Sequence, residues 1–535
     1  MIITELQQLY ATHPNVEGMC KLLKDNSVRH LYCSGLCASA ASLFSSVLVQ
    51  RAECPFVFIL GDLEEAGYFY HDLTQILGTG QVLFFPSSFR RAIKYGQKDA
   101  ANEILRTEVL SRLQKGEEGF CVVTYPDALA EKVVSRKELG DKTLKLHAGE
   151  KVDMDFVTEV LRSYGFEYVD YVYEPGQYAV RGSIIDVFSF SSEFPFRIDF
   201  FGDEVESIRT FEVESQLSKE KKEEIVIVPD LSRSLEQGGN GGMVSFLDFL
   251  RPDTLLAMRD FLWLRERIQV VHDESLTAQA IAACEAEENG AISLEGKLID
   301  GGEFTLRALD FRRMEFGTKP TGTPDATVAF STVAQPIFHK NFDLVAESFR
   351  DYLSRNYTLY ICSDSLKQTD RIRAIFEDRG DNISFTPVER TLHEGFADDT
   401  LRLCIFTDHQ LFDRFHKYNL KSDKARSGKV ALSLKELNQF TPGDYVVHTD
   451  HGVGRFTGLV RVPNGDTTQE VMRLVYQNDD VVFVSIHSLH KVSKYKGKEG
   501  EAPRLNKLGT GAWEKLKDRT KTKIKDIARD LIKLY

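Results

Sequence analysis

The sequence predicts a multi-domain chain of the α/β and α+β classes, with a small β-rich module near its C-terminus. Three observations predict this class. The length of 535 residues exceeds that of a single domain. Strand and helix patterns alternate through the first 125 residues, and alternating apolar and polar residues with several glycines occupy 443–485.

The first 125 residues are predicted to form a parallel α/β sheet. Short apolar runs that suit buried strands alternate with longer helical patterns, an order typical of parallel strands joined by helices. A return of these patterns later in the chain predicts one domain split into 1–134 and 216–333. The expected strands are 28–33, 56–60, 82–85 and 120–124, and the expected helices are 38–50, 64–77 and 98–115.

The turn after the first expected strand lies where a nucleotide-binding domain places its phosphate loop. Such a loop needs glycines for close backbone approach, a lysine for the phosphate charge and a hydroxyl for magnesium. Here Gly35 and Ser39 are present, but Ala40 and Ala41 take the places of the lysine and the hydroxyl. We therefore predict a degenerate loop that binds no nucleotide. An unrelated turn of small residues is a physically similar alternative.

A compact α+β segment, 135–215, is predicted to interrupt this domain, with strands at 177–188 and 196–201. Successive side chains of a strand point to opposite faces, so the second strand has one apolar core face and one mixed face. Charges beside a large aromatic are typical of protein-binding surfaces; the alternative is an internal Arg–Asp pair beside a partly covered Phe. The mixed face comprises Arg197, Asp199 and Phe201, which Arg181 of the neighbouring strand can join.

Four further segments follow along the chain. An α/β pattern predicts a small domain over 334–420, and a polar stretch predicts a linker over 421–437. Short strands and glycines over 438–502 predict a small barrel filled by its own side chains, which favours docking over catalysis. Over 503–535 an amphipathic pattern predicts a basic helix.

Composition excludes several classes of function. The net charge of −13 argues against a general nucleic-acid binder, although 491–535 carry fourteen basic against six acidic residues. That basic segment could face DNA or an acidic protein surface, and a solvated helix face is the plainer interpretation. No apolar run approaches the roughly 18 residues that span a bilayer, and no export signal begins the chain, so we expect no membrane partner.

The reactive side chains point to no catalytic or metal site. Eight scattered cysteines indicate reduced thiols in a cytoplasmic protein. His448 and His451 have the spacing of a metal-ligand pair, but no third ligand is evident near them. No nucleophile elbow occurs either. We expect neither catalytic residues nor a metal in this chain.

Several motifs carry a resemblance to a known family. The run from Pro442 to His448, continued from His451 to Phe456, resembles the RNA-polymerase-interacting domain of bacterial transcription-repair coupling factors (Mfd), which is similar to CarD-type regulators. The runs 178–188 and 197–205 resemble the UvrA-binding domain that these factors share with UvrB. The first domain is similar to the helicase-like (RecA-like) domain of UvrB, with its ATP site lost. On these motifs the chain is identified as the N-terminal half of a coupling factor.

The resemblance implies an adaptor that binds RNA polymerase stalled at DNA lesions and recruits UvrA for nucleotide excision repair. The UvrA contact carries over to Arg181, Arg197 and Phe201, with Asp199 on the same face. A strand edge of a Tudor/SH3-like barrel would pair with the polymerase β subunit. The residues expected at that edge are Val471, Met472, Arg473 and Leu474.

The same resemblance assigns ATP and magnesium to another part of the protein. In the family the C-terminal helix leads into an ATP-driven translocase on double-stranded DNA, whose motifs this sequence lacks. We therefore expect no cofactor and no enzyme activity in this chain itself. Two alternatives stay open: a UvrB-like ATP-dependent repair enzyme that uses the first domain, and a stand-alone CarD-type transcription regulator.

Overall fold

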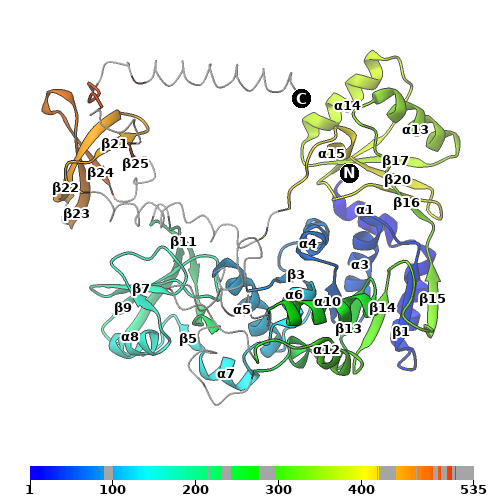
Figure 1. Cartoon of the computed structure of the whole chain (residues 1–535), viewed down its shortest axis with the longest axis horizontal. Coiled ribbons are helices and arrows are strands. Elements are labelled where there is room, and N and C mark those ends of the chain that lie inside the picture. Colours follow the sequence, from blue (N-terminus) through cyan, green and yellow to red (C-terminus); the bar gives the residue numbers. More distant parts are fainter. Residues whose placement is uncertain are drawn as a thin grey trace. The chain divides into compact units, whose positions relative to one another are not determined.

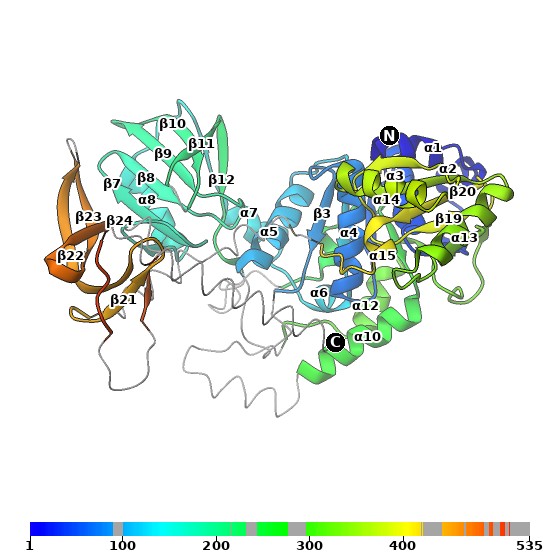
Figure 2. The same cartoon turned by 90° about the horizontal axis from the view of Figure 1, so that it is seen from above.

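The computed structural model describes two compact units of the chain. The first comprises Met1–Lys145, Phe190–Glu193 and Val226–Lys424, and the second comprises Leu146–Ser189, Phe194–Ile225 and Ala425–Tyr535. Figures 1 and 2 label their elements in two views. The described residues are 1–88, 100–213, 216–231, 243–275, 296–418, 420, 441–464, 467–485, 492–495, 503–508 and 513.

A seven-stranded sheet forms the centre of the first unit, and all its strand pairs are parallel. The order is β15-β1-β14-β13-β2-β4-β3. Strands β1 to β4, which precede the interrupting segment in the sequence, thus lie in one sheet with β13 to β15, which follow it. The parallel sheet expected from the sequence is confirmed. Its strands are β1 (His30–Ser34), β2 (Phe56–Ile59), β3 (Val82–Phe85), β4 (Cys121–Thr124), β13 (Leu255–Met258), β14 (Arg312–Glu315) and β15 (Ala326–Ala329).

Helices cover this sheet (Figure 2), which explains why β2, β3, β4 and β13 are buried at every position. All four residues of β2 are buried. The next helix begins where the Asp62 side chain accepts a hydrogen bond from the Glu65 backbone N–H. The helices are α1 (Ile3–Tyr10), α2 (Pro14–Lys24), α3 (Ala40–Arg51), α4 (Leu63–Leu77), α5 (Ala100–Gln114), α6 (Pro126–Ala130), α7 (Arg136–Asp141), η1 (Phe246–Phe249), α10 (Phe261–Ser275) and α12 (Gly301–Ala308).

A second, five-stranded sheet completes the first unit, in the order β16-β19-β20-β17-β18. Strands β18, β17 and β20 are parallel, and the other pairs are antiparallel. A buried hydrogen bond of 2.9 Å from the Tyr10 hydroxyl to Asp398 joins α1 to this sheet. Its elements are β16 (Thr332–Ala334), α13 (Phe342–Ser354), β17 (Thr358–Ser363), α14 (Leu366–Asp378), β18 (Thr386–Glu389), β19 (Phe396–Asp398), β20 (Leu403–Thr407) and α15 (Asp408–Leu411).

The second unit begins with a six-stranded sheet of order β11-β10-β9-β8-β7-β6. Its pairs are antiparallel except β6–β7. Strands β5 (Leu144–His147) and β12 (Glu224–Ile227) lie where the chain crosses between the units. The other elements are α8 (Met154–Ser163), β6 (Glu167–Tyr168), β7 (Gln177–Arg181), β8 (Ile184–Val187), β9 (Phe196–Phe201), β10 (Glu204–Phe211) and β11 (Ser218–Lys222).

A five-stranded antiparallel sheet lies nearer the C-terminus, in the order β24-β23-β22-β21-β25. Its buried core includes Phe456, Met472, Leu474 and Tyr476. The pairings of the described strands give an open order, so closure into a barrel stays a prediction. The elements are β21 (Tyr445–His448), β22 (Gly452–Asn464), β23 (Thr467–Val475), η3 (Gln477–Asp479), β24 (Val481–Ser485) and β25 (Val492–Lys494).

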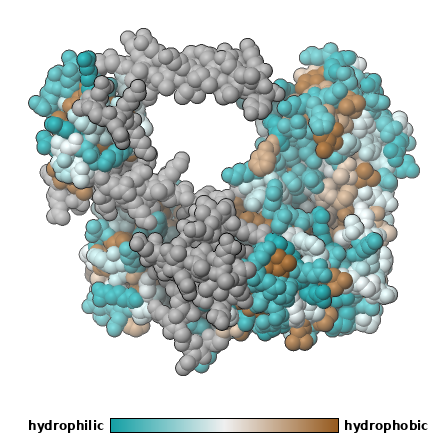
Figure 3. Space-filling model, viewed as in Figure 1, coloured by the Kyte–Doolittle hydropathy of each residue, from teal (hydrophilic) through white to brown (hydrophobic). Residues whose placement is uncertain are grey.

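Two expected segments fall outside the described residues: the linker 421–437 entirely, and the helix 503–535 apart from 503–508 and Trp513. None of the helices in the described ranges has both the length and the apolar character needed to cross a bilayer. On the face drawn in Figure 3, hydrophilic residues predominate and hydrophobic ones form small separate spots.

Candidate protein-interaction sites and the loop between β1 and α3

The outer face of the six-stranded sheet carries the residues that the sequence placed together. Along β9, Phe196, Ile198 and Phe200 are buried, whereas the side chains between them face outward. Phe201 is 79% exposed. The register pairs Ile184 with Asp199 and Arg181 with Ile184, so Arg181 lies on the same face. The predicted group therefore shares one surface.

A buried carboxylate holds two arginines on this face. Asp186 of β8 has no exposed surface. Its Oδ1 accepts from Nε of Arg197 at 2.8 Å and its Oδ2 from Nη2 at 2.9 Å, and Arg181 also donates to Oδ2. These hydrogen bonds raise the pKa of the Arg197 guanidinium. Arg197 is thus largely engaged inside its own domain, as in the internal-pair alternative, although its partner is Asp186 rather than Asp199.

Asp199 has different partners. It accepts a hydrogen bond of 2.9 Å from Ser207 and forms an ion pair with Arg209 of β10. Sequence reasoning missed both Asp186 and Arg209. An aspartate inside the apolar run of β8 was the available clue for Asp186, because a buried carboxylate needs a cationic or hydrogen-bonding partner. Phe201 and the partly exposed Arg181 are the members of the group most accessible to another protein.

The expected polymerase-binding edge is not a free strand edge. The residues of β23 from Val471 to Leu474 pair with β22 on one side and with β24 on the other, so their backbone groups are already used. Met472 and Leu474 have no exposed surface. The prediction that this segment adds a partner strand, with Met472 giving specificity, is therefore wrong. Only Arg473 of the four faces solvent.

The outermost described strands of this sheet are β24 and β25. On β24 the Phe483 side chain is 53% exposed, and it lies opposite Arg473 in the register. An arginine beside an exposed aromatic is again typical of a protein-contact surface. Sequence reasoning could not distinguish an inner strand from an outer one, because both are short runs rich in apolar residues.

The loop between β1 and α3 is shaped by its own chain. Gly35 has a φ of +77°, and a Cβ there would lie 2.0 Å from the carbonyl oxygen of Phe330. This glycine is therefore required by local packing, whether or not a phosphate approaches. Ala40 is fully buried in the core of the first unit.

A carboxylate lies at the N-terminus of α3. Asp72 of α4 accepts hydrogen bonds from the hydroxyls of Ser39 and Ser42 at 2.6 and 2.9 Å, and from the backbone N–H of His393 at 2.7 Å. Burial raises the pKa of Asp72 to about 7. The Glu394 backbone N–H also donates to Ser39 Oγ at 3.0 Å. The positive end of α3 thus faces the carboxyl group of Asp72 and a loop of the five-stranded domain.

A cavity of about 300 Å³ opens beside this loop. Its lining is mainly acidic and aromatic, with Arg259 as the one arginine or lysine among the described lining residues. Such a lining repels a triphosphate by simple Coulomb interaction. The acidic lining residues are Asp62, Glu64, Glu65, Asp72 and Glu394.

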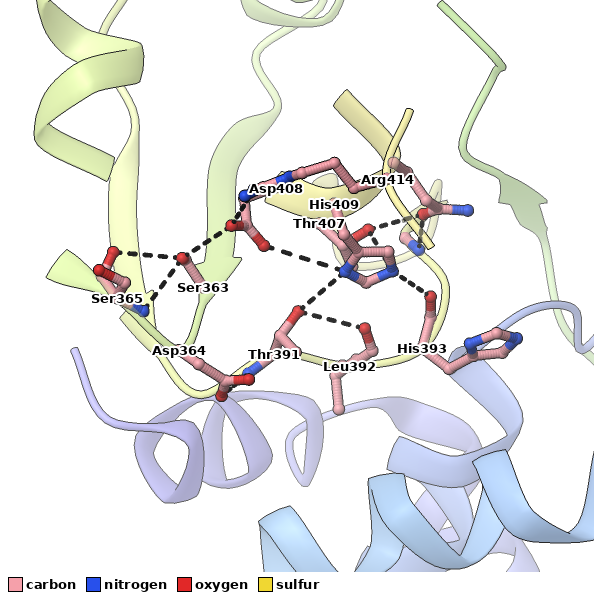
Figure 4. Close-up of polar contacts among 12 residues, drawn as sticks. Ser363, Asp364, Ser365, Thr391, Leu392, His393, Thr407, Asp408, His409 and Arg414 are labelled. Carbon is pink, nitrogen blue, oxygen red and sulfur yellow. Dashed lines mark hydrogen bonds and ion pairs between the residues drawn. The ribbon is translucent and has the colours of Figure 1, made fainter. Parts of the chain in front are cut away.

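Four histidines gather where α4 meets the loops of the five-stranded domain. Figure 4 shows His409 directed toward the Thr391 hydroxyl and toward the carbonyl of His393, with which it shares a hydrogen bond of 2.8 Å. Burial lowers the pKa of His71 and of His409 to about 4, and of His393 to about 3. His416 stacks on His409 at 4.4 Å. No group of His, Cys, Asp and Glu residues within the described ranges has the geometry of a metal site.

Two family models match parts of the chain. The UvrB interaction domain matches residues 144–232, and the CarD-like/TRCF RID domain matches residues 440–496. The transcription-repair-coupling factor of Bacillus subtilis (strain 168) is 24% identical over 94% of this chain and 48% of its own length. That of Staphylococcus aureus (strain bovine RF122 / ET3-1) has the same identity and coverage. The chain spans about half the length of the curated relatives it matches.

The two matches fall on the two surfaces described above. The first contains Asp186, Arg197 and Phe201, and the second contains β21 to β25. The resemblance to coupling factors that the sequence predicts is thereby confirmed. With both domain models matched and a similarity that extends over 94% of its residues, the chain is similar to the transcription-repair-coupling factors.

Proposed function

We propose that this chain is the adaptor half of a transcription-repair coupling factor. It binds RNA polymerase through its C-terminal sheet and UvrA through the outer face of its six-stranded sheet. In a complete protein, a translocase on double-stranded DNA would supply ATP-driven motion, with ATP and magnesium bound there. The observation that carries the proposal is the presence, in one chain, of two sheet surfaces within the two matched domains.

The UvrA contact centres on Phe201 and Arg181. An aromatic that is 79% exposed on a strand of a packed sheet offers a large rigid contact area at little cost in side-chain entropy. The neighbouring side chain of Arg181 is 36% exposed, and its guanidinium is already oriented by Asp186. Arg197 and Asp199, which are less exposed, complete the charge pattern of the face.

The polymerase contact uses the outer strand β24 rather than β23. Strand addition needs unpaired backbone groups, and β24 is the last strand in the order of the described sheet. Phe483 and Arg473 lie on the same face beside that edge. The partner is the β subunit of RNA polymerase, which would add a strand there.

The first domain serves as a scaffold without a nucleotide. Three features support this: alanines at the positions of the lysine and the magnesium ligand, the Asp72 carboxylate at the N-terminus of α3, and the acidic cavity. The chain itself is then no enzyme. The UvrB-like alternative, which needs ATP in this domain, is correspondingly disfavoured.

A two-partner binding assay tests the proposal. The chain is immobilised, and purified UvrA and core RNA polymerase are titrated separately by biolayer interferometry. We expect saturable binding of both partners. Arg181→Ala combined with Phe201→Ala should abolish UvrA binding and leave polymerase binding intact. Failure of the unaltered chain to bind either partner at low salt would overturn the proposed function.

A further inference from the structure

The ion-pair network around Asp186 has one more cation than the buried charge requires. Arg197 meets the carboxylate side-on with two hydrogen bonds, at 2.8 and 2.9 Å, and this pair alone balances the charge. Arg181 adds a second guanidinium on Oδ2. The cluster of Asp186, Arg181 and Arg197 therefore carries one net positive charge. Stability alone does not demand that surplus charge.

Both arginines depend on this carboxylate for their orientation. Two guanidinium groups drawn to the same place repel each other unless an anion lies between them. Asp186 is fully buried on β8, in register with Arg197 of β9, so its position is fixed by the sheet. Each arginine is also packed over an aromatic ring, Arg181 over Tyr171 at 5.0 Å and Arg197 over Phe211 at 4.5 Å. The carboxylate and the rings thus restrict both side chains, and Arg197 also donates a hydrogen bond of 3.1 Å to the Gln216 carbonyl oxygen.

The cluster lies on the same face as Phe201. Arg181 pairs with Ile184, and Ile184 with Asp199, which is two residues from Phe201 along β9. A partner that covers the exposed aromatic therefore also meets the surplus positive charge. Preorganised charge costs less entropy on binding than a mobile arginine does.

We propose that Asp186 is a positioning residue for the UvrA contact: it fixes Arg181 and Arg197 in the orientation that UvrA recognises, without touching UvrA itself. The inference rests on the proposed function. Asp186 is fully buried beneath the contact surface, so it acts on UvrA binding only through Arg181 and Arg197.

The first test compares two variants with the same change of charge. Asp186→Asn removes the carboxylate beneath the arginines, and Glu220→Gln removes one on β11, where Glu220 pairs with Lys222 at 2.8 Å. UvrA affinity is measured by biolayer interferometry, and folding by circular dichroism. We expect Asp186→Asn to weaken binding at least about ten-fold and Glu220→Gln to leave it unchanged. Asp186→Glu keeps the charge but displaces both guanidinium groups, so it should also weaken UvrA binding. This variant provides the test if Asp186→Asn folds poorly.

A second measurement separates positioning from a merely structural role. In a chain carrying Arg181→Gln and Arg197→Gln, Asp186 is buried without its cations. Adding Asp186→Asn to that chain should raise its melting temperature, because an unpaired buried carboxylate is removed. It should leave the already weak UvrA affinity unchanged. A purely structural role predicts that affinity recovers with stability.

The outcomes distinguish the two proposals. If the unaltered chain binds UvrA and Phe201→Ala weakens that binding, while Asp186→Asn and Asp186→Glu bind as tightly as the unaltered chain, the positioning role is overturned and the proposed function stands. If the unaltered chain captures no UvrA, the proposed function itself fails.

Discussion

The hydroxyl of Ser39 lies 2.6 Å from a carboxyl oxygen of Asp72, so the residue that precedes α3 donates its hydrogen bond to a side chain of its own domain. In a phosphate loop that place belongs to the ligand. Backbone groups of His393 and Glu394 bond to the same pair from the next domain. The loop between β1 and α3 is thus part of the packing between two domains.

The first prediction is that this chain binds no ATP. A triphosphate would need to displace the His393–Glu394 loop and approach five carboxylates with Arg259 as the one fixed cation among the described cavity residues. Titration of the whole chain with a fluorescent ATP analogue and magnesium should give no saturable signal up to about 1 mM. An active P-loop ATPase measured alongside verifies the assay. Saturable binding that Ser39→Ala removes would contradict the prediction.

The second prediction separates binding from stability on β9. Phe201→Ala should weaken UvrA binding by roughly 1–2 kcal/mol or more and leave the free energy of unfolding nearly unchanged, because the ring is mostly exposed. Phe200→Ala, one residue away and buried, should instead destabilise the chain by about 3–5 kcal/mol. Urea denaturation and biolayer interferometry measure the two effects.

Leu217→Ala is the matched control for the loss of exposed apolar surface, since Leu217 is 68% exposed on the same unit. UvrA affinity should not change in this variant. Equal losses in Leu217→Ala and Phe201→Ala would mean that UvrA contacts a broad apolar surface rather than the face of β9.

Local sequence patterns were sufficient for β1 to β4 of the seven-stranded sheet and for the two faces of β9, but they did not predict β14. Phe56–Ile59 is apolar at every position because both faces of β2 are covered, and the alternation in β9 follows from the geometry of a strand. The partners of Ser39 were out of reach. Asp72 lies 33 residues away on a helix, and Glu394 lies 355 residues away, so no local pattern links them to the loop.

The order of strands in the C-terminal sheet was equally out of reach. Val471 to Leu474 has the alternation of any half-buried strand, and only the pairing with both β22 and β24 makes it an inner strand. A strand lies at an edge when no other strand pairs with one of its sides, and the residues of the strand itself do not determine this. The face of Arg473, in contrast, follows directly from the period of two.

The third prediction follows from that correction. Met472→Ala should destabilise the C-terminal sheet by about 2–4 kcal/mol, since the side chain fills the core. Phe483→Ala and Arg473→Ala should weaken polymerase binding and leave the melting temperature nearly unchanged. Differential scanning fluorimetry and titration with core polymerase measure these effects. If Met472→Ala loses polymerase affinity at a temperature where the sheet is still folded, Met472 contacts the polymerase directly and the prediction is wrong.

The fourth prediction concerns acid. His71, His393 and His409 have pKa values of about 4, 3 and 4 in the folded chain, against about 6.5 when unfolded. Below pH 6.5 the unfolded chain therefore binds protons that the folded chain does not, and stability falls as the pH falls toward 4. Asp72, with a pKa of about 7 in the folded chain, has the opposite effect on stability. As the pH falls below 7 the folded chain binds a proton there before the unfolded chain does, so this residue makes the folded state more stable at lower pH.

Three histidines outweigh one carboxyl, so the net stability of the first unit should decrease from pH 6.5 to pH 5. His71→Phe removes one of the three contributions and should reduce that loss by about 2 kcal/mol. Asp72→Asn removes the opposing contribution and should steepen the loss. Urea midpoints at pH 7.5, 6.5 and 5.0 for the three chains give the slopes directly. If His71→Phe and the unaltered chain lose stability equally between pH 6.5 and 5.0, His71 does not stay neutral in the folded state and the packing between α4 and the His393 loop is looser than described.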